Sequence, residues 1–112
     1  MDREALKGHL DVLLLAVIEP APLHGYAIIV ELRRRSRGTF DLAESTVYPA
    51  LHRLEAAGLL RSSWATENGR QRRVYTLTAQ GRKALRAEHG KWRAFALGMN
   101  AVLQGGSWTK SA

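Results

Sequence analysis

The chain has 112 residues and 46% of them are hydrophobic, so it suits one domain with a single core and its composition excludes an intrinsically disordered protein. Lysine and arginine number 17 against 10 acidic residues, and this net charge of +7 favours a polyanionic partner. The chain has no cysteine, which excludes disulfides, thiolate catalysis and cysteine-bound zinc and fits a reducing compartment such as the cytoplasm.

Residues 4–18 are predicted to form a helix that is apolar on nearly every side. One stripe at helical spacing consists of Leu6, Leu10, Leu13, Leu14 and Val17, and further apolar residues at Val12, Leu15 and Ile18 lie beside or opposite it. Such a helix is buried on more than one side, either within one monomer or against a partner subunit. Residues 12–18 are too short to span a bilayer and resemble no secretory signal, so we expect no membrane segment.

Two prolines in residues 19–22 make a rigid connector, and His24-Gly25 opens a second predicted helix over residues 24–36. The side chains expected to face its core are Tyr26, Ile29, Val30 and Leu32. Residues 33–35 and 37 are arginines, which we interpret mainly as solvated charges that suit the C-terminal end of a helix. Gly38 should break this helix, and residues 40–42 are predicted to add a short strand to a sheet.

The third predicted helix begins at Ser45 and carries the polar and aromatic groups of greatest interest. Its apolar stripe consists of Val47, Ala50, Leu51, Leu54 and Ala57. The other faces carry Ser45, Thr46, Tyr48, His52 and Arg53. A hydroxyl of Ser45 or Thr46 should cap the first turn, with Pro49 close behind it, and Gly58 should end the helix.

A basic hairpin follows this helix. Residues 59–66 and 72–78 are rich in residues that favour strands, and Asn68-Gly69 between them is a strong hairpin signal. The hairpin places Arg70, Arg72 and Arg73 at or beside its tip. Two helices in a helix-turn-helix followed by a basic hairpin are typical of a winged helix, in which the second helix enters the major groove and the wing meets the DNA backbone or minor groove.

Thr78 is predicted to cap a last helix over residues 79–103, long for so small a domain. Its seam of apolar side chains consists of Leu85, Trp92, Phe95, Met99 and Val102. A projecting apolar seam indicates pairing with a second copy, and the residues expected at that dimer interface are Leu10, Leu14, Leu85, Trp92, Phe95 and Met99. The expected organisation is therefore a winged helix-turn-helix over residues 1–78, a dimerisation helix over residues 79–104 and a flexible tail over residues 105–112, mainly α with a small β-hairpin.

Several stretches together resemble the PadR family of bacterial transcription regulators. Residues 45–55 read STVYPALHRLE, and they are followed by Gly58-Leu59, Trp64, RRVY at 72–75 and LTAQG at 77–81. His24-Gly25-Tyr26 resembles the helix start that precedes these elements in the family, although Ser45 stands where members often have glycine. The similarity covers about residues 5–103. It implies a dimeric DNA-binding regulator, most often a repressor, and short drug-responsive members have a tryptophan in the last helix at the position of Trp92.

The expected function is therefore sequence-specific binding of double-stranded DNA at an inverted repeat. The residues expected to contact DNA are Ser45, Thr46, Tyr48, His52, Arg53, Asn68, Arg70, Arg72 and Arg73. The alternatives are a small-molecule sensor, with Trp92 stacking a planar hydrophobic ligand and Asp11 as its polar partner, or a winged helix that binds only proteins. The four histidines lack metal-ligand spacing and no nucleophile or phosphate-loop motif occurs, so we expect neither an enzyme nor a cofactor.

Overall fold

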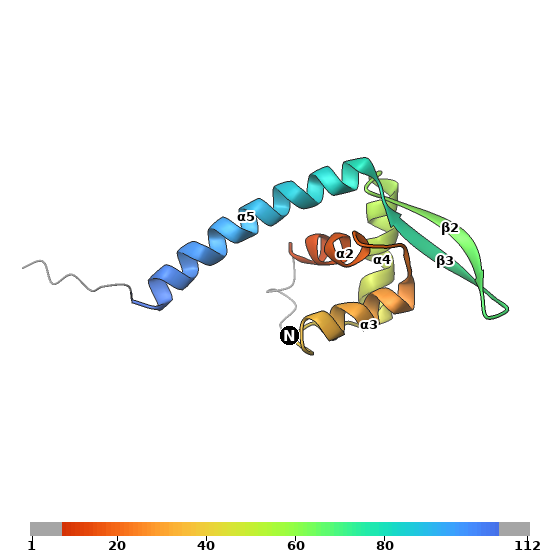
Figure 1. Cartoon of the computed structure of the whole chain (residues 1–112), viewed down its shortest axis with the longest axis horizontal. Helices are drawn as coiled ribbons and strands as arrows, with labels where there is room; N and C mark the ends of the chain where they lie inside the picture. Colours follow the sequence, from red (N-terminus) through yellow and green to blue (C-terminus); the bar gives the residue numbers. More distant parts are fainter. Residues whose placement is uncertain (1–7, 106–112) are drawn as a thin grey trace, which may run out of the picture.

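A computed structural model of the chain describes residues 8–105. In chain order its elements are α2 (Leu10–Ile18), β1 (Leu23–His24), α3 (Gly25–Arg35), α4 (Glu44–Ala56), β2 (Leu60–Glu67), β3 (Arg70–Leu77) and α5 (Ala79–Leu103). Figure 1 shows α2, α3 and α4 gathered beside the base of the β2–β3 hairpin, from which α5 extends as a single long rod. The predicted fold class is confirmed. The first four residues of the first predicted helix, and most of the predicted tail including Trp108, lie outside the described residues.

The core lies where α2, α3 and α4 meet the base of the hairpin. Its buried side chains are Leu14, Leu15, Val17, Ile18, Ile28, Ile29, Leu32, Val47, Ala50, Leu51, Leu54, Leu60, Tyr75, Leu77 and Leu85. Tyr26 and Val30 were expected in this core but are exposed. The core face of α3 is centred on Ile28 and Leu32, which are four residues apart, and a shift of two residues along a helix points to nearly the opposite side. Ala57, placed on the stripe of α4, is exposed because it lies past the helix end.

The sheet has the order β1-β3-β2 and both pairings are antiparallel. Asn68 and Gly69 both have positive φ, at 51° and 76°, as the predicted two-residue hairpin turn requires. The third strand is β1, and the strand predicted at residues 40–42 was wrong. The backbone N–H of Phe40 donates to the hydroxyl of Ser36 at 2.9 Å, so this segment closes the end of α3 instead of pairing with a strand.

Helix α4 begins one residue earlier than expected and has no side-chain cap, so the capping role predicted for Ser45 or Thr46 was wrong. Ala43 is the N-cap residue, its carbonyl accepts from the N–H groups of Thr46 and Val47, and Glu44 supplies a negative charge in the first turn. Pro49 consequently lies inside the helix and not at its first turn. Gly58 ends the helix at φ +82° as predicted.

The hydroxyl of Thr78 caps α5 as predicted, because it accepts from the N–H of Gly81 at 2.9 Å. Only the first turns of α5 are anchored in the core, through Gly81 and Leu85. Leu14 and Leu85, two residues expected at a dimer interface, are buried within the core of the single chain and so are not free to meet a partner. No helix in the part of the chain that the structure describes is long and apolar enough to cross a membrane.

Candidate nucleic-acid interface

The outward face of α4 lies opposite its buried stripe. Ser45, Pro49 and His52 follow one another at helical spacing and are exposed, while Thr46 and Tyr48 are half-buried at the two sides of this face. The predicted polar face therefore exists, and its small and imidazole side chains leave the helix free to approach a groove.

Arg53, which also points away from the core, is held by an acidic residue of α2. Its Nη2 and Nη1 atoms lie 2.7 Å and 2.8 Å from the two carboxylate oxygens of Asp11, a bidentate pair that ties α4 to α2. The side chains of Arg53 and Asp11 are 58% and 43% exposed, and the hydrogen bonds to Asp11 raise the pKa of Arg53. Two residues expected to bind different partners thus bind each other.

The wing arginines differ in their surroundings. Arg70 and Asn68 are exposed at the hairpin tip. Arg73 lies 3.8 Å from a carboxylate oxygen of Glu55 and stacks over the ring of Trp64 at 5.3 Å. The hydroxyl of Ser62 donates to the same Glu55 carboxylate at 2.5 Å, so this acid, Arg73 and Trp64 fix the wing against α4.

Arg72 points instead to the start of α3. Its Nη1 lies 3.5 Å from Nδ1 of His24, and the same nitrogen accepts from the N–H of Ala27 at 3.3 Å, which makes His24 the cap of α3. The other imidazole nitrogen, Nε2, faces Glu67 at 3.9 Å. Arg72 has no carboxylate partner among the described residues, so its charge remains available at this surface.

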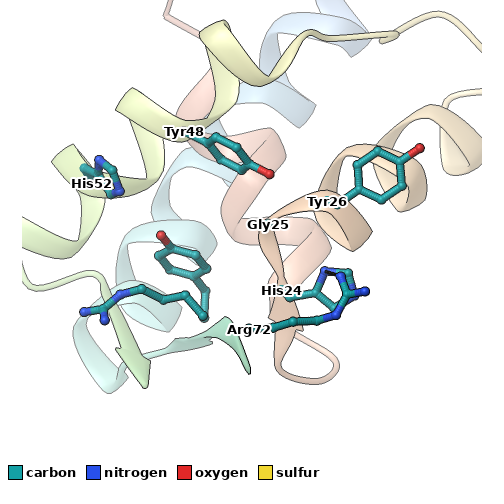
Figure 2. Close-up of a pocket in the computed structure, with 8 residues that line it drawn as sticks. His24, Gly25, Tyr26, Tyr48, His52 and Arg72 are labelled. Carbon is teal, nitrogen blue, oxygen red and sulfur yellow. Dashed lines mark hydrogen bonds between the residues drawn. The ribbon is translucent and has the colours of Figure 1, made fainter. Parts of the chain in front are cut away.

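A pocket of about 330 Å³ lies between the start of α3, helix α4 and the wing (Figure 2). The lining residues are His24, Gly25, Tyr26, Tyr48, His52, Arg72, Arg73 and Tyr75. Four of the predicted DNA-contact residues are thereby brought together. Sequence analysis missed His24, Tyr26 and Tyr75 as residues of this surface, although all three tyrosines of the chain line it.

Tyr48 closes one side of this pocket because glycine stands opposite it. A Cβ atom on Gly25 would lie 2.4 Å from Cε1 of the Tyr48 ring, so only glycine allows the ring to pack there. Burial raises the pKa of the Tyr48 phenol and of the Tyr75 phenol, which keeps both hydroxyls protonated and able to donate.

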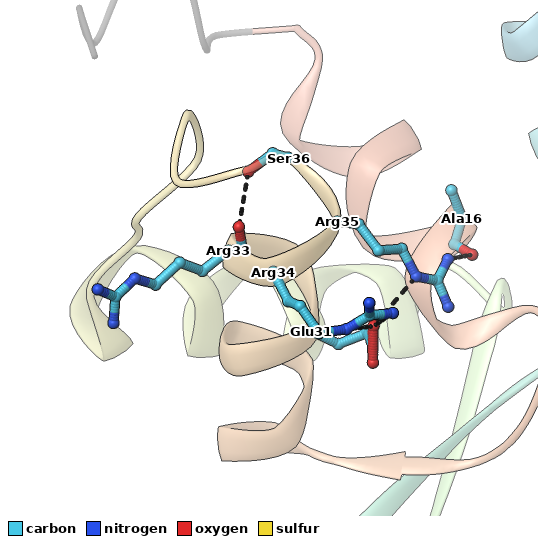
Figure 3. A network of polar contacts seen from close by, with 6 residues as sticks. All are labelled: Ala16, Glu31, Arg33, Arg34, Arg35 and Ser36. Atoms are coloured by element: carbon cyan, nitrogen blue, oxygen red, sulfur yellow. Dashed lines mark hydrogen bonds and ion pairs between the residues drawn. The ribbon is translucent and has the colours of Figure 1, made fainter.

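The arginines at the end of α3 form an ordered network, which corrects part of their interpretation as solvated charges (Figure 3). Arg34 and Arg35 both pair with Glu31, and the hydrogen bond from Arg34 is the main cause of the lowered pKa of Glu31. Arg35 also donates to the carbonyl of Ala16 at 3.4 Å, which ties α3 to α2. Arg33, by contrast, is exposed and forms no ion pair within residues 8–105.

A second pocket of about 390 Å³ lies between the N-terminal end of α2 and the middle of α5. Its lining residues are Gly8, His9, Val12, Glu88, Lys91, Trp92 and Phe95. The Trp92 ring lies 5.2 Å from the His9 ring in an edge-on contact and 5.6 Å from the Phe95 ring. Asp11, the polar partner expected for a ligand beside Trp92, does not line this pocket, whereas Glu88 does. In residues 8–105 no three potential metal-ligating side chains of histidine, cysteine or acid type come together.

Comparison with known proteins gives a consistent result. The model of the transcriptional regulator PadR-like family matches residues 14–87. The transcriptional regulator Rv3488 of Mycobacterium tuberculosis is 48% identical over 63 residues, and the match spans 56% of this chain and only 56% of that protein. The crystal structure of a PadR family transcription regulator from Clostridium difficile R20291 is 33% identical, with a TM-score of 0.75 over 86% of this chain and 99% of that one. Bacillus subtilis PadR in complex with operator DNA shares the fold, with a TM-score of 0.65 at 22% identity over 73% of this chain and 46% of that one.

Proposed function

The chain belongs to the PadR-like family of transcriptional regulators, and we propose that it acts as a homodimeric repressor that binds operator DNA through α4 and the wing. The observation that carries this proposal is the surface on which His52 and Tyr48 of α4 line the same pocket as Arg72 and Arg73 of the wing. A helix with a free polar face and a basic hairpin beside it are the two parts that a winged helix uses on DNA. The fold shared with the operator complex of Bacillus subtilis PadR supports the same arrangement.

In this proposal α4 enters the major groove and reads base edges with its outward face. Ser45, Tyr48 and His52 are the side chains placed to do so, because they project on the side away from the core. Arg70 and Asn68 at the exposed hairpin tip meet phosphate or the minor groove. Arg53 contributes less than the sequence suggested, since Asp11 already holds its guanidinium on both sides.

Selection of bound duplexes from a random-sequence library tests DNA reading directly. We expect an inverted repeat with half-sites about 34 Å apart, or a multiple of that distance. On the selected operator His52→Ala should cost about 1–3 kcal/mol of binding free energy and much less on random DNA. His89→Ala, on the exposed surface of α5, is the matched control and should change neither. Absence of any enriched sequence would refute sequence-specific binding, and equal losses on both DNAs would make His52 a phosphate contact.

We propose further that the outer half of α5, within the dimerisation helix of residues 79–104, pairs with a second copy of the chain. Trp92, Phe95 and Met99 are 47%, 56% and 44% exposed and lie on one side of the helix. Contiguous apolar surface of this kind marks an interaction site, and a two-fold dimer would cover it on both chains. Such a dimer also presents two copies of α4, as an inverted repeat requires.

Sedimentation tests this pairing. Phe95→Asp combined with Met99→Asp should convert dimers into monomers, because two carboxylates would be buried without partners. Ala94→Asp combined with Ala101→Asp adds the same charges to the opposite, exposed side of α5 and should leave the dimer intact. A protein that stays dimeric with aspartates at 95 and 99 would place the interface elsewhere.

The second pocket supports a regulatory proposal, namely that a planar aromatic cation binds beside Trp92 and weakens DNA binding. The ring of Trp92 offers a stacking surface, and the carboxylate of Glu88 among the lining residues favours a positive charge. Trp92→Ala should abolish fluorescence quenching by 9-aminoacridine, whereas Trp64→Phe, on the wing, should retain it. Equal quenching in the Trp92 variant and the unaltered protein would exclude this site.

A further inference from the structure

We propose that the pocket between α3, α4 and the wing is a seat for a single phosphate group, held by the hydroxyls of Tyr48 and Tyr75, by the guanidinium of Arg72 and by the N-terminal end of α3. The assignment of that phosphate to the DNA backbone rests on the proposed function. The seat itself depends on the chemistry of the pocket and on no particular source of phosphate.

Tyr75 is the first observation in favour of a ligand. Its side chain is only 3% exposed and lines the pocket, and its hydroxyl has no hydrogen-bond partner among the described residues. No polar side-chain atom there is both fully enclosed and unpaired, so the Tyr75 hydroxyl must reach the open space of the pocket. A protonated donor that is otherwise buried is most favourable when it meets an acceptor at this opening.

The start of α3 is the second observation. The helix has 11 residues, and its first residues, Gly25 and Tyr26, line the pocket. The first turn of a helix carries partial positive charge and amide groups without intrahelical partners, which attract anions. Figure 2 shows Tyr48 extending from α4 toward this helix start, where the ring packs against Gly25.

The charge balance also favours an anion. Arg72 has no carboxylate partner among the described residues, whereas Arg73 shares its charge with Glu55 at 3.8 Å. Glu67 faces His24 but does not line the pocket. Hydroxyl, guanidinium and helix-terminus donors thus come from the wing, α4 and α3, and donors on several sides suit a tetrahedral anion with several oxygens better than a planar carboxylate.

The position of the pocket favours the DNA backbone as the source of the phosphate. His52 on the outward face of α4 forms part of its lining, as does Arg72 of the wing. A sugar–phosphate strand that runs between a major-groove helix and the wing would pass over this opening. A free phosphate or a phosphorylated small molecule would satisfy the same donors.

The first arm of the test measures binding of the full-length protein to a random-sequence duplex by fluorescence anisotropy. Tyr75→Phe should weaken binding roughly tenfold, because it removes one hydrogen bond to a charged oxygen, and should leave the salt dependence unchanged because no charge is lost. Tyr48→Phe should act in the same direction and provides an independent variant. Arg72→Gln should weaken binding and also lower the slope of log affinity against log salt by about one per occupied seat. Thr66→Val, which removes a hydroxyl from the exposed wing surface, is the matched control and should bind as the unaltered protein does.

The second arm titrates inorganic phosphate into the DNA-free protein, against chloride at equal ionic strength, and follows the tyrosine ring signals by NMR. All three tyrosines line the pocket, so occupation should shift their signals and Tyr75→Phe should abolish the response. Weakened DNA binding without a response to free phosphate identifies the backbone as the source. A response to free phosphate with unchanged DNA binding identifies a soluble ligand. If the unaltered protein binds no duplex yet responds to phosphate, the proposed function falls and the seat stands. Duplex affinity equal in all variants together with no response to phosphate would overturn the proposal.

Discussion

Replacement of Thr78 by valine tests how the wing joins the long helix. The Thr78 hydroxyl accepts from the N–H of Gly81 at 2.9 Å and donates to the carbonyl of Gly58 at 2.7 Å, so one oxygen caps α5 and satisfies the turn after α4. Valine has nearly the same shape and removes both hydrogen bonds. Loss of a helix cap costs about 1 kcal/mol, and the partly buried Gly58 carbonyl left unpaired adds about 1–2 kcal/mol. We therefore expect Thr78→Val to lower the free energy of unfolding by about 2–3 kcal/mol.

Urea denaturation followed by circular dichroism measures this change, at one fixed protein concentration because the stability of a dimer depends on it. Thr78→Ser is the control, since it keeps the hydroxyl and removes only a methyl group, and it should cost about 1 kcal/mol or less. Equal stability of the valine and serine variants would refute the reasoning, because the hydroxyl would then contribute nothing. A changed denaturant slope in the valine variant would point to an altered unfolded or native state instead.

Three further predictions concern the core, the α2–α4 contact and the tyrosines. Leu51 is 0% exposed, so Leu51→Ala should destabilise the fold by about 2–5 kcal/mol in the same denaturation assay, and a loss below about 1 kcal/mol would contradict its place in the core. The pair of Asp11 and Arg53 lies at the surface, so a double-mutant cycle with alanines should give a coupling of only about 0.2–1 kcal/mol, and this coupling should shrink in high salt. Folding raises the pKa of Tyr48 and Tyr75, so the resulting stabilisation should be complete below pH about 10 and be lost as pH rises through the higher folded values. Ultraviolet titration should show two tyrosines that ionise later in the folded protein than in urea.

Local chemistry made the elements of this fold predictable. Asn68-Gly69 defines a two-residue turn by the positive φ that both residues tolerate, and the alternation of residues 74–77 then sets the register of the wing. Thr78 and Gly58 mark helix ends because a hydroxyl and a left-handed glycine satisfy the free backbone groups there. These signals lie within a few residues of the structure that they determine.

The errors arose where distant parts of the chain decide the outcome. Tyr26 and Val30 were placed in the core because they are apolar at helical spacing, yet the packing of α3 against α2 and α4 selects Ile28 and Leu32 instead. The strand β1 has only two residues and exists because it pairs with β3, which its own sequence does not indicate.

The candidate site shows the same limit. His52, Arg72 and Arg73 were recognisable as polar or charged groups on predicted surfaces, but their meeting in one pocket depends on how α4 and the wing pack. The pairing of Asp11 with Arg53, 42 positions apart in the chain, is likewise a tertiary contact. A pattern of residues therefore indicated which side chains are exposed, and only the packing showed which of them act together.

The salt dependence of binding to a random-sequence duplex tests the central claim, that α4 and the wing form a DNA-binding surface, most directly. We predict that log affinity falls linearly with log salt with a slope of about −3 or steeper, because several phosphates are contacted by the two copies of the surface. Replacement of Arg70 and Arg72 by glutamine should make the slope shallower by about one to two, while the same exchange at Arg82 and Arg86 on α5 should leave it unchanged. A slope near zero, or a slope that responds to the α5 exchanges and not to those in the wing, would contradict the account.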